Sequence, residues 1–191
     1  MRRLILKMSM SVDGFVAGPN GEIDWMVRSR DEGGKAAIAE TLWNAGLHAM
    51  GSKSYFPWAA YWPTSTDLLA APMNDIPKVV FTRQRSLNLV SGDSPNAASW
   101  AEAQVANGDL ATEIARLKQQ PGKDILAHGG VGFAQSLARL GLVDEYRLVV
   151  HPVALGAGLS LFAELPEPLH LRLVSTSIFG SGVASHVYRP A

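Results

Sequence analysis

Three glycines within residues 129–132 are the strongest candidates in this chain for a ligand-binding turn. Residues 124–128 before them form an apolar run typical of a buried strand, and Phe133, Leu137 and Leu140 after them recur at the spacing of one helix face. A strand-to-helix turn made of glycine leaves backbone N–H groups pointing outward at the positive end of the helix dipole, which favours phosphate. The pattern therefore predicts a dinucleotide diphosphate at residues 129–132.

Two further strand ends carry hydroxyl and cationic side chains, at residues 51–54 and 82–85. In an open α/β sheet, ligands bind beyond the carboxyl ends of the strands, so all three stretches are expected to meet at one crevice. Phosphate-binding candidates in the two stretches are the cations Lys53, Arg83 and Arg85 and the hydroxyls of Ser52, Ser54 and Thr82, because the arginine fork in particular matches phosphate geometry. The glycine turn is not a Rossmann fingerprint, since it lacks the full G-x-G-x-x-G and the acidic residue expected after it.

The composition limits the partners and the compartment. Hydrophobic residues make up 47% of the 191 residues and charged ones 18%, which is enough for a sizeable core. The 17 Lys and Arg balance the 17 Asp and Glu, so no global attraction to nucleic acid or to an anionic membrane is expected. The absence of cysteine excludes disulfides and thiolate metal sites and fits a cytoplasmic protein. The apolar run that stops at Lys7 is too short for a signal peptide, and no stretch predicts a membrane span.

The order of apolar runs and turn signals predicts one α/β domain over residues 1–191. Strands are expected at residues 3–11, 47–50, 78–82, 98–105, 124–128 and 146–155, and helices at residues 36–45, 110–120 and 133–140. Residues 169–178 and 183–189 predict a closing β-hairpin, and residues 56–77 are expected to be mostly irregular. Strands and helices that alternate up to residue 155 favour a mostly parallel sheet with an antiparallel edge.

An ordered set of short motifs gives the chain a family resemblance. The motifs are SMSVDGFVA at residues 9–17, GEIDW at 21–25, MGSKSY at 50–55, KVVFTR at 78–83, HGGVGF at 128–133, GLVDEY at 141–146 and LGAGLSLF at 155–162. In this order they resemble the dihydrofolate reductase-like superfamily, and within it the reductase domain of riboflavin-biosynthesis deaminase-reductases and their stand-alone relatives. The resemblance implies a central, mainly parallel sheet of about eight strands flanked by helices. The zinc signature of the deaminase half is missing, so the reductase module stands alone.

The resemblance also implies an activity and a cofactor. It implies an NADPH-dependent reductase that transfers a hydride to a small heterocyclic substrate, pterin-like or ribosylaminopyrimidine-like, and that forms a homodimer. The implied cofactor contacts are Gly51, Ser52, Lys53, Ser54, Thr82 and Arg83 around the adenosine 2′-phosphate, and Gly129, Gly130, Val131, Gly132 and Phe133 around the diphosphate. A cis peptide bond between Gly129 and Gly130 is implied as well, although such a bond costs about 2.5–4 kcal/mol without proline. A rival interpretation is a nucleotide-binding protein of the same fold without turnover.

Reduction of a C=N or C=O bond needs a proton besides the hydride, and a carboxylic acid can supply it. The acidic residue of dihydrofolate reductases follows the Trp-bearing loop, which by position falls on Asp31 or Glu32 after Trp25. Asp31 is the catalytic candidate; its alternative is a helix-entry charge that satisfies N-terminal amides. Asp13 and Asp24 compete for the role, or else fix the loop through turn hydrogen bonds.

Aromatic and imidazole side chains complete the set of candidates. An aromatic cluster follows the second strand end, and it either stacks on a planar heterocycle or packs a long loop; its members are Phe56, Trp58, Tyr61 and Trp62. The five histidines are scattered without an H-x-x-x-H pair, so no metal site is expected. His128 and His151 at strand ends are expected to be hydrogen-bonded structural residues.

Overall fold

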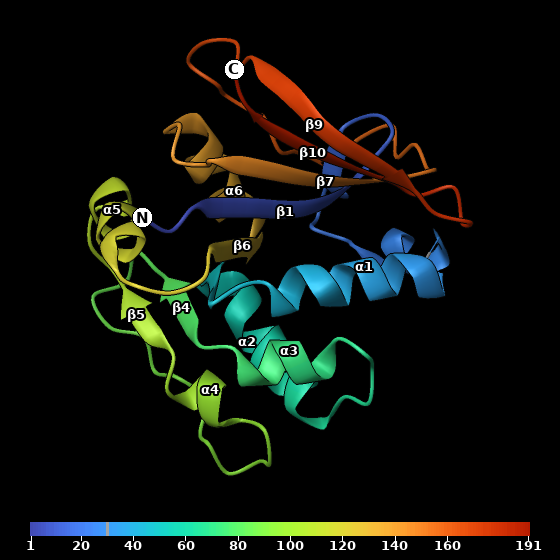
Figure 1. The fold of residues 1–191 in the computed structure, drawn as a ribbon. Coiled ribbons are helices and arrows are strands. Elements are labelled where there is room, and N and C mark those ends of the chain that lie inside the picture. Colours follow the sequence, from blue (N-terminus) through green and yellow to red (C-terminus); the bar gives the residue numbers. More distant parts are fainter. Residues whose placement is uncertain (30) are drawn as a thin grey trace.

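The computed structural model describes residues 1–29 and 31–191 of the chain. An eight-stranded sheet with the order β5-β4-β3-β6-β1-β7-β10-β9 crosses its middle (Figure 1). The strands are β1 (Leu4–Ser11), β3 (Leu47–Gly51), β4 (Lys78–Phe81), β5 (Gln104–Ala106), β6 (Ile125–Gly129), β7 (Glu145–His151), β9 (Leu171–Ile178) and β10 (Ala184–Pro190). Neighbours from β5 to β7 are parallel, whereas β10 runs antiparallel to both β7 and β9. The predicted fold class, a mostly parallel α/β sheet closed by an antiparallel hairpin, is confirmed.

Helices cover both faces of the parallel part of this sheet (Figure 1). One face carries α1 (Glu32–Trp43), α2 (Ser52–Tyr61), α3 (Ala70–Asp75) and α4 (Ala98–Ala101), and the other carries α5 (Leu110–Gln119) and α6 (Val131–Arg139). Alternation along β1 shows how one strand serves both layers. Leu4 and Leu6 pack with Leu137 of α6, whereas Ile5 packs in the cluster that contains Tyr55 of α2. Successive side chains of a strand point to opposite faces, so a strand buried on both sides is apolar throughout.

Short elements complete the chain on either side of the sheet. A second, two-stranded sheet pairs β2 (Phe15–Ala17) with β8 (Leu159–Ser160) in antiparallel fashion. A 3-10 helix at Asp24–Ser29 precedes α1, and another at Trp62–Thr64 follows α2. Asp109 caps α5 by accepting from the Thr112 amide at 2.9 Å, so the helix predicted at residues 110–120 is present with its first turn capped.

The prediction that residues 56–77 are mostly irregular was wrong, because α2 and α3 occupy much of this stretch. Tyr55 and Ala59 are buried on the inner side of α2, and their packing against the sheet stabilises the helix. Pro57 removes one hydrogen bond of α2, but it lies on the exposed side next to Phe56. Loss of this hydrogen bond destabilises the helix, and the packing of Tyr55 and Ala59 offsets the loss.

The strand predicted at residues 98–105 was also wrong in its first half. Residues 98–101 form α4, and only the following β5 pairs with β4. The helical turn carries Trp100 into the core, where its side chain is fully buried and Nε1 donates to Oδ1 of Asn74 at 2.9 Å. A buried indole with its N–H paired outweighs the weak strand pattern of this segment.

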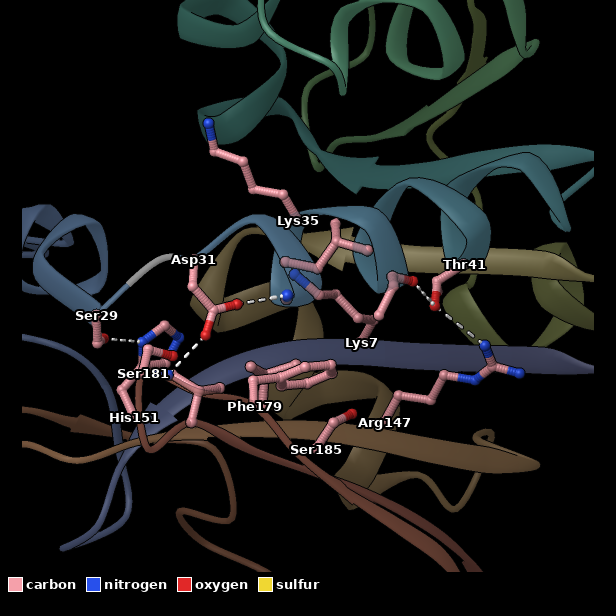
Figure 2. Close-up of a pocket in the computed structure, with 15 residues that line it drawn as sticks. Lys7, Ser29, Asp31, Lys35, Thr41, Arg147, His151, Phe179, Ser181 and Ser185 are labelled. Atoms are coloured by element: carbon pink, nitrogen blue, oxygen red, sulfur yellow. Dashed lines mark hydrogen bonds between the residues drawn. The ribbon is translucent and has the colours of Figure 1, made fainter.

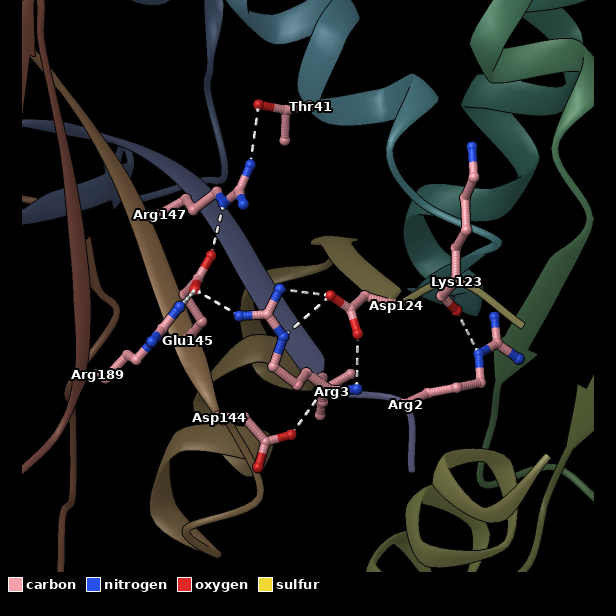
Figure 3. A network of polar contacts seen from close by, with 10 residues as sticks. Arg2, Arg3, Thr41, Lys123, Asp124, Asp144, Glu145, Arg147 and Arg189 are labelled. Atoms are coloured by element: carbon pink, nitrogen blue, oxygen red, sulfur yellow. Dashed lines mark hydrogen bonds and ion pairs between the residues drawn. The ribbon is translucent and has the colours of Figure 1, made fainter. Parts of the chain in front are cut away.

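An ionic network joins the strands at the end of the sheet opposite to the glycine turn (Figure 3). The carboxylate of Glu145, 2% exposed, accepts from Arg3, Arg147 and Arg189 at 3.0, 2.9 and 2.9 Å. Burial raises the pKa of Glu145, but hydrogen bonds from Arg189 and Arg147 outweigh it, and the pKa ends below its ordinary value. Glu145 therefore stays ionised and holds the starts of β1 and β7 to the end of β10.

Candidate functional site

The three stretches predicted to bind phosphate lie at one edge of the sheet. Strands β4, β3 and β6 are consecutive neighbours and parallel, so their carboxyl ends at Phe81, Gly51 and Gly129 face the same way. The residues that follow these ends are the ones that the sequence singled out. The predicted convergence of the three stretches is confirmed.

The turns after β3 and β6 touch each other through their backbones. A Cβ placed on Gly130 would lie 3.5 Å from both N and Cα of Gly51, and a Cβ placed on Gly51 would lie 3.2 Å from Cβ of Phe133. The Phe133 ring stacks on Phe81 at the end of β4, with ring centroids 4.7 Å apart. Small residues at 51 and 130 thus allow two strand-to-helix turns to form one surface.

Both of these turns end in the start of a helix without a side-chain cap among the described residues. Gly51 is the N-cap of α2 and Gly130 is the N-cap of α6. The first amides of a helix have no partner within it, and they carry the positive end of the helix dipole. Two such sets of amides, next to each other at one sheet edge, have the hydrogen-bonding capacity that an anion with more than one charged group requires.

The predicted cis bond between Gly129 and Gly130 was wrong, because every peptide bond among the described residues is trans. The reversal of the chain is made instead by Gly130, whose φ of +87° lies in the region that favours glycine. A left-handed residue directs the amide of Val131 into α6 without any cis bond. The glycine requirement at residue 130 therefore has a different origin from the one predicted.

Gly129 lies beneath an aromatic side chain that the sequence did not connect with it. A Cβ on Gly129 would lie 2.6 Å from Cη2 of Trp58 and 3.1 Å from Cβ of Ser54. The Trp58 ring also packs on His128, with centroids 5.1 Å apart. Of the predicted aromatic cluster, Trp58 thus packs α2 onto the glycine turn, which the expectation of an irregular segment could not reveal.

The cationic candidates lie at the surface around these turns. Lys53 and Arg83 are exposed, and neither forms an ion pair with another described residue. Ser52, Ser54 and Thr82 are half-buried, and Oγ1 of Thr82 accepts from the Gln84 amide at 3.1 Å. The side chains are therefore free to turn towards an anion at the same edge.

A buried polar cluster lies deeper along the same strands, formed by His48, Lys78 and His128. The His48 and His128 rings meet edge to face at 4.6 Å, and burial together with the charge of Lys78 lowers the pKa of His48 to about 3. Burial likewise lowers the pKa of His128 well below its ordinary value. Both imidazoles are therefore neutral at neutral pH.

Lys78 contributes an amine to this cluster without a carboxylate in contact with it. Nζ donates to the carbonyl of Ile76 and to Oγ of Ser99, both at 2.6 Å, and lies 4.5 Å from the ring centroid of Trp100. Burial lowers the pKa of Lys78 to about 7. The amine supports the segment that leads into β4 and does not reach the surface of the site.

A pocket lies between α1, strands β1 and β7, and the C-terminal hairpin (Figure 2). The pocket has a water-accessible volume of about 60 Å³ and is partly open to solvent. Apolar groups form most of its wall surface, although many of the residues that line it are polar or charged; the lining includes Lys7, Ser29, Lys35, Ile38, Thr41, Arg147, Val149, His151, Phe179, Ser181, Val183 and Ser185. A pocket with a mostly apolar surface and polar groups that can orient a ligand is typical of a small-molecule site.

Asp31 lies at the mouth of this pocket as the N-cap of α1 (Figure 2). Its Oδ1 accepts from the Gly34 amide at 2.7 Å, and its Oδ2 accepts from the Ser181 amide at 2.6 Å. The hydrogen bonds from Gly34 and Ser181 lower the pKa of Asp31 below its ordinary value. Asp31 is therefore ionised at neutral pH, and one lone pair on each oxygen is left for a further donor.

The competing carboxylates occupy other positions. Asp13 accepts from the amides of Leu155 at 3.0 Å and Gly156 at 2.7 Å. It therefore fixes the loop after β1, which was the expected alternative to a catalytic role. Glu32 has a side chain 91% exposed, and Asp24 begins the 3-10 helix before α1. Among these four carboxylates, Asp31 is the one that lines the pocket.

His151 at the end of β7 faces the same pocket. Its Nδ1 is 2.6 Å from Oγ of Ser29, and its ring meets Trp25 edge to face at 5.4 Å. The hydrogen bond expected of His151 is present, and the contact holds the helix Asp24–Ser29 against β7. The same expectation is not met at Nε2 of His128, which is buried without a hydrogen-bond partner among the described residues.

Several pocket residues were not predicted from the sequence. Lys7 interrupts the apolar run of β1, and Arg147 interrupts that of β7, where its Nη1 donates to Oγ1 of Thr41 at 3.3 Å. A cation within a buried strand is a signal that could have pointed to a lined cavity. Phe179 and Ser181 come from the hairpin turn, and nothing in their spacing connects them with α1.

Two other kinds of site find no support in the described residues. No three His, Asp or Glu side chains gather there in a group able to hold a metal ion. No helix within residues 1–29 and 31–191 has the length and apolar character needed to cross a membrane.

These features define an α/β protein with glycine turns at the carboxyl edge of its parallel strands and a pocket between α1 and the sheet. The RibD C-terminal domain family model matches residues 2–185, and the chain belongs to this family. The Bacillus subtilis (strain 168) protein YyaP, whose name assigns no activity, is 34% identical over 188 residues, which are 98% of this chain and 94% of YyaP.

Solved structures share the fold. RibD of Acinetobacter baumannii gives a TM-score of 0.74 at 17% identity, with 100% of this chain and 58% of that chain covered. A pyrimidine reductase-like protein of Corynebacterium diphtheriae gives a TM-score of 0.70 at 14% identity, with 100% of this chain and 92% of that chain covered. The second structure has nearly the extent of this chain, whereas RibD is much longer.

Proposed function

We propose that this protein is an NADPH-dependent reductase that transfers a hydride to a small heterocyclic compound, pterin-like or ribosylaminopyrimidine-like. The observation that carries the proposal is the contact between two helix starts, capped only by Gly51 and Gly130, at the carboxyl edge of the parallel strands. Membership of the RibD C-terminal domain family and the name of a structural neighbour, pyrimidine reductase-like protein, support the same class of reaction.

The residues of this edge fit the phosphates of NADPH. Backbone amides at the start of α6, from Val131 to Phe133, would hold the diphosphate, and the glycines at 129, 130 and 132 leave room for it. The start of α2, with Gly51, Ser52, Lys53 and Ser54, would hold the 2′-phosphate together with Thr82 and Arg83. Exposed cations without an ion pair lose little when they turn to a phosphate, and the arginine can bind it with two hydrogen bonds. When bound, NADPH supplies the hydride.

The pocket beneath α1 would hold the substrate. Asp31 is the proposed catalytic carboxylate, and in its ionised form it would accept a hydrogen bond from a ring N–H and so orient the heterocycle. Because its pKa is lowered by the Gly34 and Ser181 amides, a proton for the reaction would come from water that Asp31 positions and not from a stored carboxylic acid proton. The apolar wall excludes other water from the reacting face.

We further propose that residues 1–191 form one domain, and that the protein is a cytoplasmic homodimer. The family model spans nearly the whole chain, which supports one domain. Leu173, Val174 and Ile178 of the edge strand β9 are exposed apolar side chains, and they are candidates for the contact between two copies. Sedimentation equilibrium measures the mass in solution, and a monomer at all concentrations would contradict the dimer.

The function is tested in two steps. Titration with NADPH, followed by its own fluorescence, measures cofactor binding and should give tighter binding than NADH. Loss of NADPH absorbance with dihydropterin and ribosylaminopyrimidine substrates then tests turnover. Binding without oxidation of NADPH by any of these compounds favours the rival, a nucleotide-binding protein without turnover. The absence of any NADPH binding would refute both.

A further inference from the structure

The tip of the C-terminal hairpin reaches across to the first turn of α1. Phe179 precedes the turn of this hairpin, whose ends are joined by the bond from the Phe179 amide to the Val183 carbonyl at 2.9 Å. The Phe179 ring lies beside two consecutive glycines of α1, since a Cβ on Gly33 or Gly34 would be 3.7 or 3.8 Å from it. Residues nearly 150 positions apart in the sequence thus share one wall of the pocket.

A charged hydrogen bond holds this tip in place. Asp31 accepts from the Gly34 amide on α1 and from the Ser181 amide on the hairpin, so one carboxylate ties the two elements together (Figure 2). Hydrogen bonds to an ionised acceptor are about twice as strong as neutral ones. Strand β9 is exposed along most of its length. The position of the tip therefore depends on Asp31 and on the contact of Phe179 with α1.

The chemistry of the pocket wall gives Phe179 a distinct part. Ile38, Val149 and Val183 supply aliphatic surface, whereas Phe179 carries the one benzene ring among the described residues that line the pocket. Aromatic rings prefer offset stacking or edge contacts with other flat rings, worth about 0.5–1.5 kcal/mol beyond the area they bury. An aromatic wall beside a carboxylate acceptor suits a flat ring that carries N–H groups at its edge.

We propose that Phe179 is a specificity-determining residue that stacks on a planar heterocycle, and that Asp31 is also the positioning residue for the hairpin tip that carries it. The proposal rests on the function proposed above, because it assigns the pocket beneath α1 to the substrate. It adds that Phe179 in the C-terminal hairpin, and not only Asp31, determines which heterocyclic substrate binds.

Equilibrium binding of pterin, a flat and fluorescent heterocycle, tests the role of Phe179 without any turnover. Phe179→Leu should weaken pterin binding roughly 2- to 10-fold, the range that follows from the loss of one aromatic contact. Phe179→Tyr should bind pterin as the wild type does. The matched control is Leu140→Ala, because Leu140 is an apolar residue that is 53% exposed and does not line the pocket.

The outcomes separate this inference from the proposed function. Equal pterin affinity in Phe179→Leu and wild type, or no pterin binding to a wild type that binds NADPH, overturns the inference. Pterin binding that depends on Phe179 in a protein that does not bind NADPH overturns the reductase and leaves the inference standing.

Hydrogen exchange in the ligand-free protein tests the positioning role of Asp31. Asp31→Asn should speed exchange at the Ser181 amide at least several-fold, because a neutral acceptor replaces a charged one. Exchange at the Thr112 amide, which Asp109 caps in α5, serves as the internal control and should not change. Unchanged exchange at Ser181 overturns the positioning role.

Discussion

Replacement of Gly129 by alanine tests whether the glycine turn is shaped by contact with Trp58. The added methyl would lie 2.6 Å from Cη2 and 2.9 Å from Cζ3 of Trp58, distances that real Cβ atoms do not tolerate. The indole cannot easily retreat, because His128 packs against it. Overpacking of a well-packed core typically costs about 1–3 kcal/mol. For a chain of this size each kcal/mol lowers the melting temperature by roughly 2–4 °C, so Gly129→Ala should melt roughly 2–12 °C below the wild type.

The turn must also change shape in this variant, which affects the proposed cofactor. If about 1.4 kcal/mol is needed to restore the turn on binding, the affinity for NADPH falls about tenfold. Differential scanning fluorimetry measures the melting temperature, and fluorescence titration measures the affinity.

Gly132→Ala is the matched control for the methyl group itself. A Cβ on Gly132 would meet nothing within 4 Å, and alanine in a helix is favoured over glycine by about 0.5–1 kcal/mol. Gly132→Ala should therefore keep or raise the melting temperature. It should still weaken NADPH if the diphosphate lies against this turn, which separates loss of the ligand site from loss of the fold.

A double-mutant cycle with Trp58→Leu identifies the clash as the cause. In the Trp58→Leu background the alanine at 129 should cost much less, with a remainder from Ser54, whose Cβ would be 3.1 Å away. An unchanged melting temperature in Gly129→Ala, or the same loss with and without the indole, would refute the reasoning.

Three more predictions follow from the charges of the structure. Arg83→Ala should reduce the preference for NADPH over NADH with little change in NADH affinity, since Arg83 is exposed and free of ion pairs with described residues; an unchanged ratio contradicts its assignment to the 2′-phosphate. Glu145→Gln should lower the free energy of unfolding at pH 7 by about 3 kcal/mol. This is the low end of the cost of removing one partner of a buried ion pair, because the three arginines are partly exposed. The pKa of Glu145 is lowered in the folded protein, so the ionised carboxylate stabilises the fold above its unfolded pKa and this stabilisation is lost in acid. Urea unfolding should therefore show a smaller difference in stability between the wild type and Glu145→Gln at pH 3 than at pH 7. For Lys78 the folded pKa of about 7 lies below the ordinary 10.5, so the unfolded chain binds more protons between these values and stability rises with pH across this window. Lys78→Met should remove that rise, of the order of 2–3 kcal/mol between pH 7 and 9.5, and a rise of equal size in the variant would show that another group causes it.

The sequence by itself determined the alternation of strands and helices, because the spacing of apolar residues and the positions of glycines specify local secondary structure. The strands that end at Gly51, Phe81 and Gly129 could be recognised one by one, and the rule for parallel sheets then brought their ends to one edge. The prediction of a cis bond between Gly129 and Gly130 was wrong, because Gly130 turns the chain with a positive φ and a trans bond.

Tertiary packing decided what local patterns leave open. The helix α2 forms despite Pro57 because Tyr55 and Trp58 pack onto the sheet, and no local signal reports that gain. Asp31 was found from the sequence as a pocket candidate, but its second partner, the Ser181 amide, lies 150 residues further along the chain. Such contacts arise only when the hairpin folds back over α1, since hydrogen bonds and stacking act over a few ångströms in space whatever the separation in sequence. The meeting of the three strand ends at one edge was therefore predictable from local chemistry, and the wall of the pocket was not.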